Sequence, residues 1–315
     1  MRLRAYASLA AAGVAWGTAF VLGKIAFAEL SVEHLLFYRF IFAVIGLAPL
    51  LRGPRGRAAI AACMADLPTF SAAAIAGVPV MYLVQYSGLH RTTVSHASLM
   101  MGVVPVLFAM AGTVFHHERL RPTIWMAVLA STLGAALIVF GAGRSTDPHG
   151  PSLVGDLLVI ASTVAGVAWA LLSKRLMSSR GGQSPAGITA AVIIAGTVPL
   201  LAWVLIHSGP PPIHLSAGTW AAVIAQGLLC TSAATVFWNW GLSHVSPSLA
   251  GVFINLDPLT GTVLGVLIFS DVLSPPTLAG GALIIGATLF VSLYQPGATT
   301  TQASAGRHRD PESST

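Results

Sequence analysis

Charged side chains are scarce in this sequence. Asp, Glu, Lys and Arg make up 8% of the 315 residues, whereas hydrophobic residues make up 55%. An average soluble domain has about 25% charged residues. So few charges cannot cover the apolar surface of a soluble fold of this size. The composition therefore excludes an ordinary soluble domain and predicts that much of the surface meets lipid.

Cysteines and enzymatic motifs are also rare or missing. The chain has two cysteines, Cys63 and Cys230, and they offer neither a metal-ligand spacing nor a plausible disulfide. The sequence lacks an HExxH metalloprotease motif, a nucleophile elbow and a Walker phosphate-binding loop. We therefore expect no enzyme activity, no cofactor and no bound metal. The net charge of +6 includes no basic run interleaved with aromatics, so no nucleic-acid partner is expected.

Long apolar runs are what the sequence has in abundance. A helix that crosses a bilayer needs roughly 17–25 residues, and the charges fall between runs of about this length. These runs are continuously apolar, whereas the strands of a membrane barrel alternate. We therefore predict an all-α membrane protein with ten transmembrane helices in the cell membrane. The expected spans are 5–27, 34–51, 67–89, 92–115, 121–141, 152–176, 186–207, 216–242, 247–269 and 275–294.

The distribution of Lys and Arg predicts the orientation, because these residues concentrate in cytoplasmic loops. With the amino terminus inside, Arg91 and Arg144 face outward and most other basic residues face the cytoplasm. Lys24 and Arg39 lie within spans near the outer surface, where they can snorkel or bind a ligand. Both termini are therefore expected in the cytoplasm, with a disordered tail over 296–315. Oligomeric state is not readable from the sequence.

A four-residue word, GVAW, occurs at 13–16 and again at 166–169. The same offset of 153 residues relates further pairs, which are Gly88 and Gly241, Ser95 and Ser248, Pro105 and Pro258, and Pro122 and Pro275. One offset that serves the first, fourth and fifth helices indicates an internal duplication. The expected units are 8–141 and 152–293, each with five spans.

An odd number of spans makes the second unit cross the membrane in the opposite sense to the first. Two inverted units that exchange conformations provide inward-open and outward-open states, with a binding site between them near the midplane. The sequence therefore predicts a secondary transporter for a small molecule. A membrane scaffold or sensor is the alternative, and it predicts no cavity that solutes can reach.

Several longer stretches carry a resemblance to a known family. They are GVAWGTAFVLGK in the first helix, YRFIFA at 38–43, VVPVLFAMAGTVFHHERLRP at 103–122 and its partner NLDPLTGTVLGVLIFSDVLSP at 255–275. In this order, and duplicated, they resemble the EamA-type members of the drug/metabolite transporter superfamily. The resemblance implies two five-helix units and the export of small metabolites such as amino acids. The family often has Glu at the place that Asp257 occupies before its proline.

Asp257 is the most informative single residue. It lies about midway along the ninth expected span, where a charge costs roughly 2.5–3.5 kcal/mol. It is either a proton carrier or partner for a cationic group of the substrate, or a protonated side chain bonded to neighbouring helices. Its counterpart in the first unit is Val104. We take Asp257 as the candidate for coupling.

Other candidates for a cavity come from helices one, three, six, eight and nine. Tyr82, Gln85 and Tyr86 share one helical face, and that face is too polar for lipid. Trp16 and Trp169 lie in mid-span, where they line a cavity or fill the core. Asn239 lies between two tryptophans that can anchor the helix at the interface, and Asn255 can bond a substrate or a neighbouring helix. His96 stands alone in its span and is expected to be structural.

Two prolines at equivalent positions, Pro105 and Pro258, are expected to kink the fourth and ninth helices. Each lacks an amide proton and frees the carbonyl four residues earlier. The kinks can serve packing alone, or they can serve as gating points because they occur at matching depths in both units.

Overall fold

The computed structural model of this chain is built from helices. It describes residues 2–104, 106–107, 110, 122–141, 150–178, 184–244 and 253–294. Within these ranges there is no strand, which confirms the predicted all-helical fold. Pro105, the acidic helix end at 117–120 and the tail over 296–315 lie outside the described residues.

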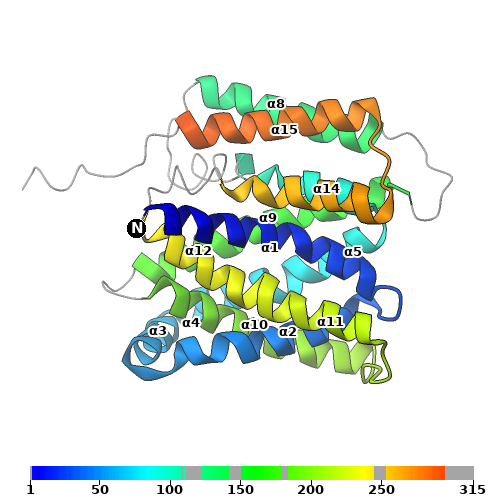
Figure 1. Ribbon diagram of the computed structural model, residues 1–315. Helices are drawn as coiled ribbons and strands as arrows, with labels where there is room; N and C mark the ends of the chain where they lie inside the picture. The colour runs from blue at the N-terminus through cyan, green and yellow to red at the C-terminus, as the bar shows by residue number, and fades with distance from the viewer. Residues whose placement is uncertain are drawn as a thin grey trace, which may run out of the picture.

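The described elements form one bundle of helices that run side by side (Figure 1). Those of the first half are α1 (Arg2–Ala26), α2 (Val32–Leu47), the 3₁₀ turn η1 (Ala48–Leu51), α3 (Gly53–Ala65), α4 (Leu67–Ile75), the π-helical segment η2 (Ala76–Val80), α5 (Met81–His90), α6 (Val94–Met101) and α8 (Pro122–Gly141). Those of the second half are α9 (Leu153–Ser178), α10 (Pro185–His207), α11 (Ala217–Ala225), the π-helical segment η3 (Gln226–Ala233), α12 (Ala234–Leu242), α14 (Leu256–Phe269) and α15 (Pro275–Tyr294).

The start of α1 and the end of α15 lie at the same end of this bundle (Figure 1). We call it the terminal end. The opposite end, where α1 finishes and α2 begins, is the distal end. Which of the two ends faces the cytoplasm stays a prediction from the basic residues.

Six stretches of the described chain are helical, long enough and apolar enough to cross a membrane. They are Leu3–Ala26, Val32–Leu51, Leu67–His90, Leu153–Met177, Pro185–His207 and Ala217–Leu242. Shorter apolar helical stretches are Trp125–Ile138, Leu256–Phe269 and Pro275–Ala287. These helices bear out a multi-pass membrane protein. The count of ten spans stays a prediction.

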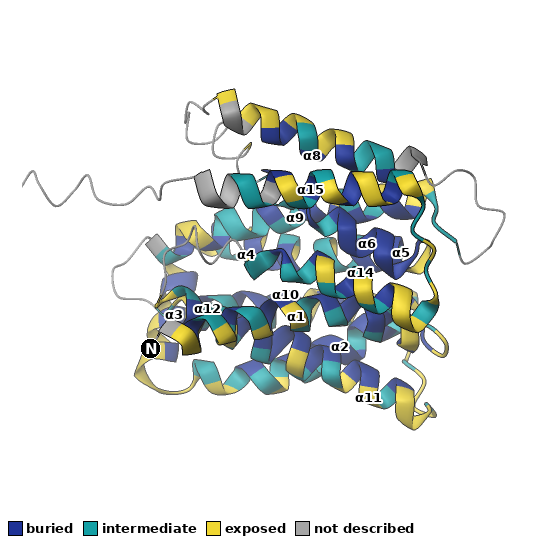
Figure 2. Ribbon diagram, turned by 45° about the horizontal axis from the view of Figure 1, so that its top comes forward, coloured by how far each residue is buried: buried dark blue, intermediate teal, exposed yellow. Residues whose placement is uncertain are grey.

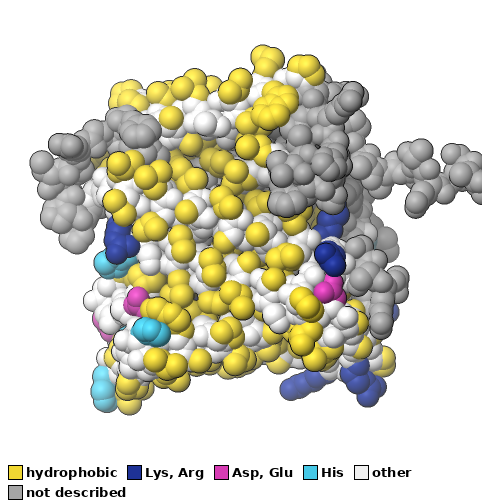
Figure 3. All heavy atoms as spheres, turned by 180° about the vertical axis from the view of Figure 1, so that it is seen from behind, with side chains coloured by type: hydrophobic (Ala, Val, Ile, Leu, Met, Phe, Trp, Pro, Cys, Tyr) yellow, Lys and Arg dark blue, Asp and Glu magenta, His cyan; other side chains and the backbone are white. Residues whose placement is uncertain are grey.

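The outer surface of the bundle is apolar. Large hydrophobic side chains are exposed on it, among them Leu267 at 73% and Val198 at 67%. Figure 2 shows that exposed residues recur along the outward sides of the helices, while buried ones gather inside. On the face in Figure 3, hydrophobic side chains fill the middle and charged ones lie toward the two edges. A surface of this kind is stable in lipid rather than in water.

Local features that start and end helices recur at the sequence offset. Ser31 and Ser184 stand 153 residues apart, and each accepts a hydrogen bond from a backbone N–H of the helix it begins, α2 or α10. Such caps satisfy amides that the first helical turn leaves without partners. The closing helices α8 and α15 have the same length, and their bounds differ by the same offset.

Glycines let specific helices approach closely. A Cβ on Gly13, in the first GVAW word, would lie 2.6 Å from the carbonyl oxygen of Phe253, just before α14. A Cβ on Gly17 would collide with the carbonyl oxygen of Asp257. Small residues of this kind are common where membrane helices pack backbone to backbone. The close contact of α1 with α14 therefore holds Asp257 beside α1.

Candidate functional site

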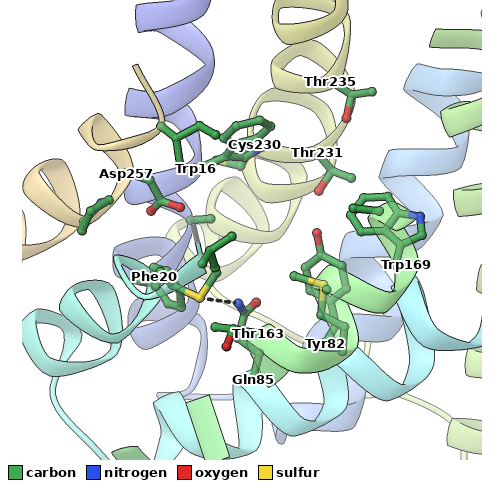
Figure 4. A pocket seen from close by; sticks show the side chains of 18 of the residues that line it. Trp16, Phe20, Tyr82, Gln85, Thr163, Trp169, Cys230, Thr231, Thr235 and Asp257 are labelled. Carbon is green, nitrogen blue, oxygen red and sulfur yellow. Dashed lines mark hydrogen bonds between the residues drawn. The ribbon is translucent and has the colours of Figure 1, made fainter. Parts of the chain in front are cut away.

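A cavity of about 360 Å³ lies between the two halves of the bundle. Side chains from α1, α2, α5 and α6 line it from the first half, and side chains from α9, α10, η3, α12 and α14 line it from the second. Its volume falls within the roughly 300–1,000 Å³ typical of pockets for small molecules. Figure 4 shows polar side chains pointing into it among aromatic ones.

Most of the residues singled out in the sequence meet at this cavity. Those that line it are Trp16, Tyr82, Gln85, Tyr86, Trp169, Asn255, Asp257 and Pro258. They come from helices that are far apart in the sequence, so only the folded chain brings them together. Pro105 cannot be assigned a place because it lies outside the described residues.

Asn239 does not line the cavity, contrary to its selection as a cavity residue. Its side-chain amide donates a hydrogen bond of 2.8 Å to the carbonyl of Thr235, one turn earlier in α12. Its neighbour Trp238 lines the cavity instead and packs against Trp16, with ring centroids 5.2 Å apart and ring planes tilted by 48°. Adjacent residues point about 100° apart around a helix, and the rotation of α12 turns Trp238 rather than Asn239 toward the cavity.

Asp257 lies on the cavity wall at the start of α14. Its Oδ1 is buried and makes no hydrogen bond with any described residue. Neither of the two ion pairs among the described residues includes it. A buried carboxylate normally requires a partner, so this one is available for a proton or for a ligand.

The polar face of α5 forms another part of the wall. Gln85 donates a hydrogen bond of 3.2 Å to the sulfur of Met101, the dashed line in Figure 4. The hydroxyl of Tyr86 donates to the carbonyl of Ala19 at 3.3 Å, which ties α5 to α1. The spacing of these residues predicted one shared face, and both are buried on it.

Arg39 is a cavity residue for which the sequence left two roles open, snorkelling and binding a ligand. Both roles assumed a position near the outer surface. In the structure Arg39 is only 3% exposed, and it lines the cavity from α2. Its Nε donates to the hydroxyl of Thr231 at 3.1 Å, and its Nη1 donates to the hydroxyl of Tyr86. The rare occurrence of Arg inside a span was the available signal, because such residues usually face the bundle interior.

Two long helical stretches, the one that ends with α5 and the one that ends with α12, are distorted beside the cavity. The π-helical segment η2 precedes Met81 and Tyr82, and η3 contains Cys230 and Thr231, all four of which line the cavity. π-helical turns inside α-helices are frequent at functional sites. Hydropathy locates these spans but does not reveal the distortions.

The helix before each expected kink is interrupted. After α6 the chain turns at Gly102 and Val103, and before α14 it turns at Asn255. Gly102 and Asn255 are 153 residues apart, and both line the cavity. Pro258 lies in the first turn of α14, where its missing N–H costs little. Broken helices near the midplane form binding sites in many carriers.

Trp169 combines the two roles that the sequence left open for it. It lines the cavity, and its ring also packs on η2, where a Cβ on Gly77 would lie 2.5 Å from Cδ1 of the indole. Gly77 is therefore required for this contact. The residue serves the cavity wall and the packing of α9 on η2 together.

A second buried polar cluster lies nearer the distal end. His96 of α6 is not alone, because its Nδ1 is 3.0 Å from a carboxylate oxygen of Asp156 in α9. The other oxygen of Asp156 accepts a hydrogen bond of 2.6 Å from Thr92. Nearby, Asp271 accepts a hydrogen bond of 2.8 Å from the backbone N–H of Ser95. These contacts join the first half to the second on the distal side of the cavity.

Lys24 also contributes to this end of the bundle. Its Nζ donates to the carbonyl of Thr92 at 2.8 Å and to that of Leu89 at 3.3 Å. It therefore caps the end of α5 and does not line the cavity. Within the described ranges, no group of three or more His, Cys, Asp or Glu side chains could hold a metal ion.

Comparisons with known proteins agree with this arrangement. The model of the EamA-like transporter family matches the chain twice, over residues 3–140 and 153–293. An uncharacterized transporter of Archaeoglobus fulgidus is 24% identical over 94% of this chain and 99% of its own length. The biotin transporter of Salmonella typhimurium is 25% identical over 96% of this chain and 97% of its own length. A solved protein crystal structure shares the fold with a TM-score of 0.61 at 19% identity, over 93% of this chain and 98% of that chain.

Proposed function

Because this chain belongs to the EamA-like transporter family, we propose that it is a secondary transporter that exports small metabolites, such as amino acids or related compounds, across the cell membrane. The observation that carries the proposal is the cavity between the two halves, inside an apolar bundle, with Asp257 on its wall and no hydrogen bond from any described residue to its Oδ1. Because relatives such as the Salmonella typhimurium protein are named biotin transporters, biotin is a compound to include in the transport assay.

The proposed topology is ten spans in two inverted units over 8–141 and 152–293, with both termini in the cytoplasm. The repeated caps at Ser31 and Ser184 and the matching bounds of α8 and α15 support the duplication. The family match over two segments supports it as well. Inverted units can exchange shapes, and this exchange opens the cavity to each side in turn.

Opening toward the distal end requires contacts between the halves to separate. The pair formed by His96 and Asp156 joins α6 to α9, and the pair formed by Ser95 and Asp271 joins α6 to α14. We assign these contacts to the state that is closed on the distal side. We assign the interruptions at Gly102 and Asn255, with the prolines Pro105 and Pro258, to the points where the helices bend during the exchange.

The energy for transport comes from a gradient. Asp257 is the proposed coupling residue, because a carboxyl on the cavity wall whose Oδ1 is hydrogen-bonded by no described residue can gain a proton on one side of the membrane and release it on the other. The alternative function is a scaffold or sensor that moves no solute, and it requires no access of water to the cavity.

Thiol accessibility distinguishes these two functions. In a variant without Cys63 and Cys230, we would place a single cysteine at Trp16, Tyr82 or Asn255 and treat membranes with a sulfonated, water-soluble maleimide. We expect labelling at these positions and none for Val198→Cys, which lies on the exposed apolar surface of α10. A membrane-permeant maleimide then checks that each thiol is present. Absence of labelling at all three cavity positions in the folded protein would favour the scaffold.

A further inference from the structure

The charge on Arg39 is buried, and no described residue supplies a counter-ion for it. No Asp or Glu oxygen in the part of the chain that the structure describes lies within 4.0 Å of its guanidinium nitrogens. Its guanidinium lies instead 4.6 Å from the ring centroid of Tyr82 and 5.2 Å from that of Tyr86. Aromatic faces and hydroxyl groups stabilise the cation in part, but a buried charge is best balanced by an anion.

The hydrogen bonds of Arg39 leave part of its donor fork available. Nε donates to Thr231 and Nη1 donates to Tyr86, whereas Nη2 has no hydrogen bond to any described residue. An Arg side chain that is held by its partners and keeps free N–H groups is suited to bidentate binding of a carboxylate. Because Arg39 lines the cavity and neither Asp257 nor any other described carboxylate pairs with it, a ligand in the cavity can supply the carboxylate.

The remainder of the cavity restricts what else the ligand carries. Trp16, Phe20, Trp169 and Trp238 make much of its wall aromatic. Asp257 supplies a negative group on the α14 side of the same cavity, and it disfavours a second anionic group on the ligand. The ligand therefore has one carboxylate and an apolar or cationic remainder.

We propose that Arg39 binds the carboxylate of the transported molecule, so that the substrates are small organic acids with a single anionic group. This assignment rests on the proposed transport function and adds the substrate class to it. Tyr86 and Thr231 act as positioning residues, because they hold the guanidinium while leaving its outer edge toward the cavity.

The first test uses the unaltered protein, purified in detergent, and follows the fluorescence of the tryptophans that line the cavity. The probes are three monoacids (phenylacetate, indole-3-acetate and hexanoate), the amide of each, and phenylmalonate as a diacid. We expect at least one acid to bind about tenfold more tightly than its amide, because the amide cannot form the charge-assisted pair. Phenylmalonate should bind more weakly than phenylacetate. Equal affinities for acids and amides, or no binding of any acid, would overturn the proposal.

The second test replaces Arg39. In Arg39→Gln the preference for acid over amide should disappear while the affinity for the amide is kept, and Arg39→Lys should retain part of the preference. Lys174→Gln removes an exposed basic residue and serves as the control with the unaltered preference. A folded Arg39→Gln variant that keeps the full preference would make Arg39 a structural residue. If Arg39→Gln does not fold, the comparison of acids with amides on the unaltered protein decides.

The two proposals fail in different ways. If water-soluble maleimide does not reach the cavity positions, the transport function itself is wrong. If it does reach them and the acids show no advantage over their amides, transport stands and only the assignment of the substrate class falls.

Discussion

The first half of the chain has Arg39 on the wall of the cavity, whereas the residue 153 positions later, in the second half, is the buried Val192. The opposite holds for the acid, because Asp257 of the second half corresponds to Val104 of the first. Trp16 and Trp169, in contrast, are the same residue at corresponding positions, and both line the cavity. The halves thus share their packing residues and differ in their charges. Two halves of similar shape need the same residues for packing. A substrate whose two ends differ chemically needs different residues from each half.

The two π-helical segments, η2 in the first half and η3 in the second, have a similar backbone but are built from different residues. In η2 the distortion includes Pro79, which has no N–H to donate. In η3 the side chains of Thr231 and Ser232 donate instead to the carbonyls of Gln226 and Gly227, at 2.9 Å and 3.0 Å. Both chemistries relieve backbone groups that a π turn leaves poorly paired. Similar backbone shapes are therefore reached by different residues, and only η3 gains a hydroxyl that also holds Arg39.

The largest effect is expected from removing the acid that distinguishes the second half. Asp257→Asn keeps the shape of the side chain but cannot release a proton. In proteoliposomes, uphill transport driven by a pH gradient should fall to the level of liposomes without protein, while counterflow of the labelled compound that binds best should persist. Asp257→Glu should restore uphill transport. If the Asn variant concentrates substrate as well as the unaltered protein, Asp257 is structural.

A smaller effect, on stability, is expected where the halves are alike. In the contact of α8 with α15, a Cβ on Gly134 would collide with the carbonyl oxygen of Gly280, and a Cβ on Gly280 would collide with that of Gly134. Gly134→Ala and Gly280→Ala should each destabilise the protein by about 1–3 kcal/mol through overpacking. Gly286→Ala is the matched control in α15, because nothing lies within 4 Å of its Cβ position.

Thermal unfolding of the three glycine variants in detergent measures this loss of stability. Similar losses for Gly134→Ala and Gly280→Ala, with no loss for Gly286→Ala, would show that the closing helices contribute equally. A loss of stability in only one of Gly134→Ala and Gly280→Ala would contradict the prediction that α8 and α15 contribute equally to their contact.

The smallest effect concerns a link between the halves at the distal end. Glu29, in the turn between α1 and α2, accepts hydrogen bonds from the N–H of Ser216 at 2.8 Å and from the hydroxyl of Thr219 at 2.9 Å. These hydrogen bonds hold the pKa of Glu29 below its ordinary value, and those from Ser216 contribute more than the one from Thr219. A lowered folded-state pKa contributes stability that is present above the unfolded pKa and is lost as the pH falls through the folded one.

Glu29→Gln should therefore lower the melting temperature slightly at neutral pH, and the difference from the unaltered protein should shrink in acid. Glu33→Gln, in the first turn of α2, is the control for loss of a nearby carboxylate. A difference that stays constant across this pH range would mean that ionised Glu29 does not stabilise the contact.

Much of the architecture was predictable from the sequence. The scarcity of charge and the long apolar runs predicted a helical membrane protein, because apolar length is a property of the chain itself. The offset of 153 predicted which residues correspond between the halves, among them Pro122 and Pro275, which begin α8 and α15. Helical spacing predicted the polar face of α5, and depth within a span singled out Asp257.

The tertiary structure decided which of the polar residues meet. Hydropathy reports depth but not the rotation of a helix, so it could not distinguish Trp238, which lines the cavity, from Asn239, which bonds to Thr235. It could not show that the charge of Arg39 is buried beside Tyr82. Nor could it pair His96 with Asp156, because their contact depends on how α6 packs against α9. Apolar runs determine that a helix enters the membrane, but which of its faces meets the cavity depends on the packing of neighbouring helices.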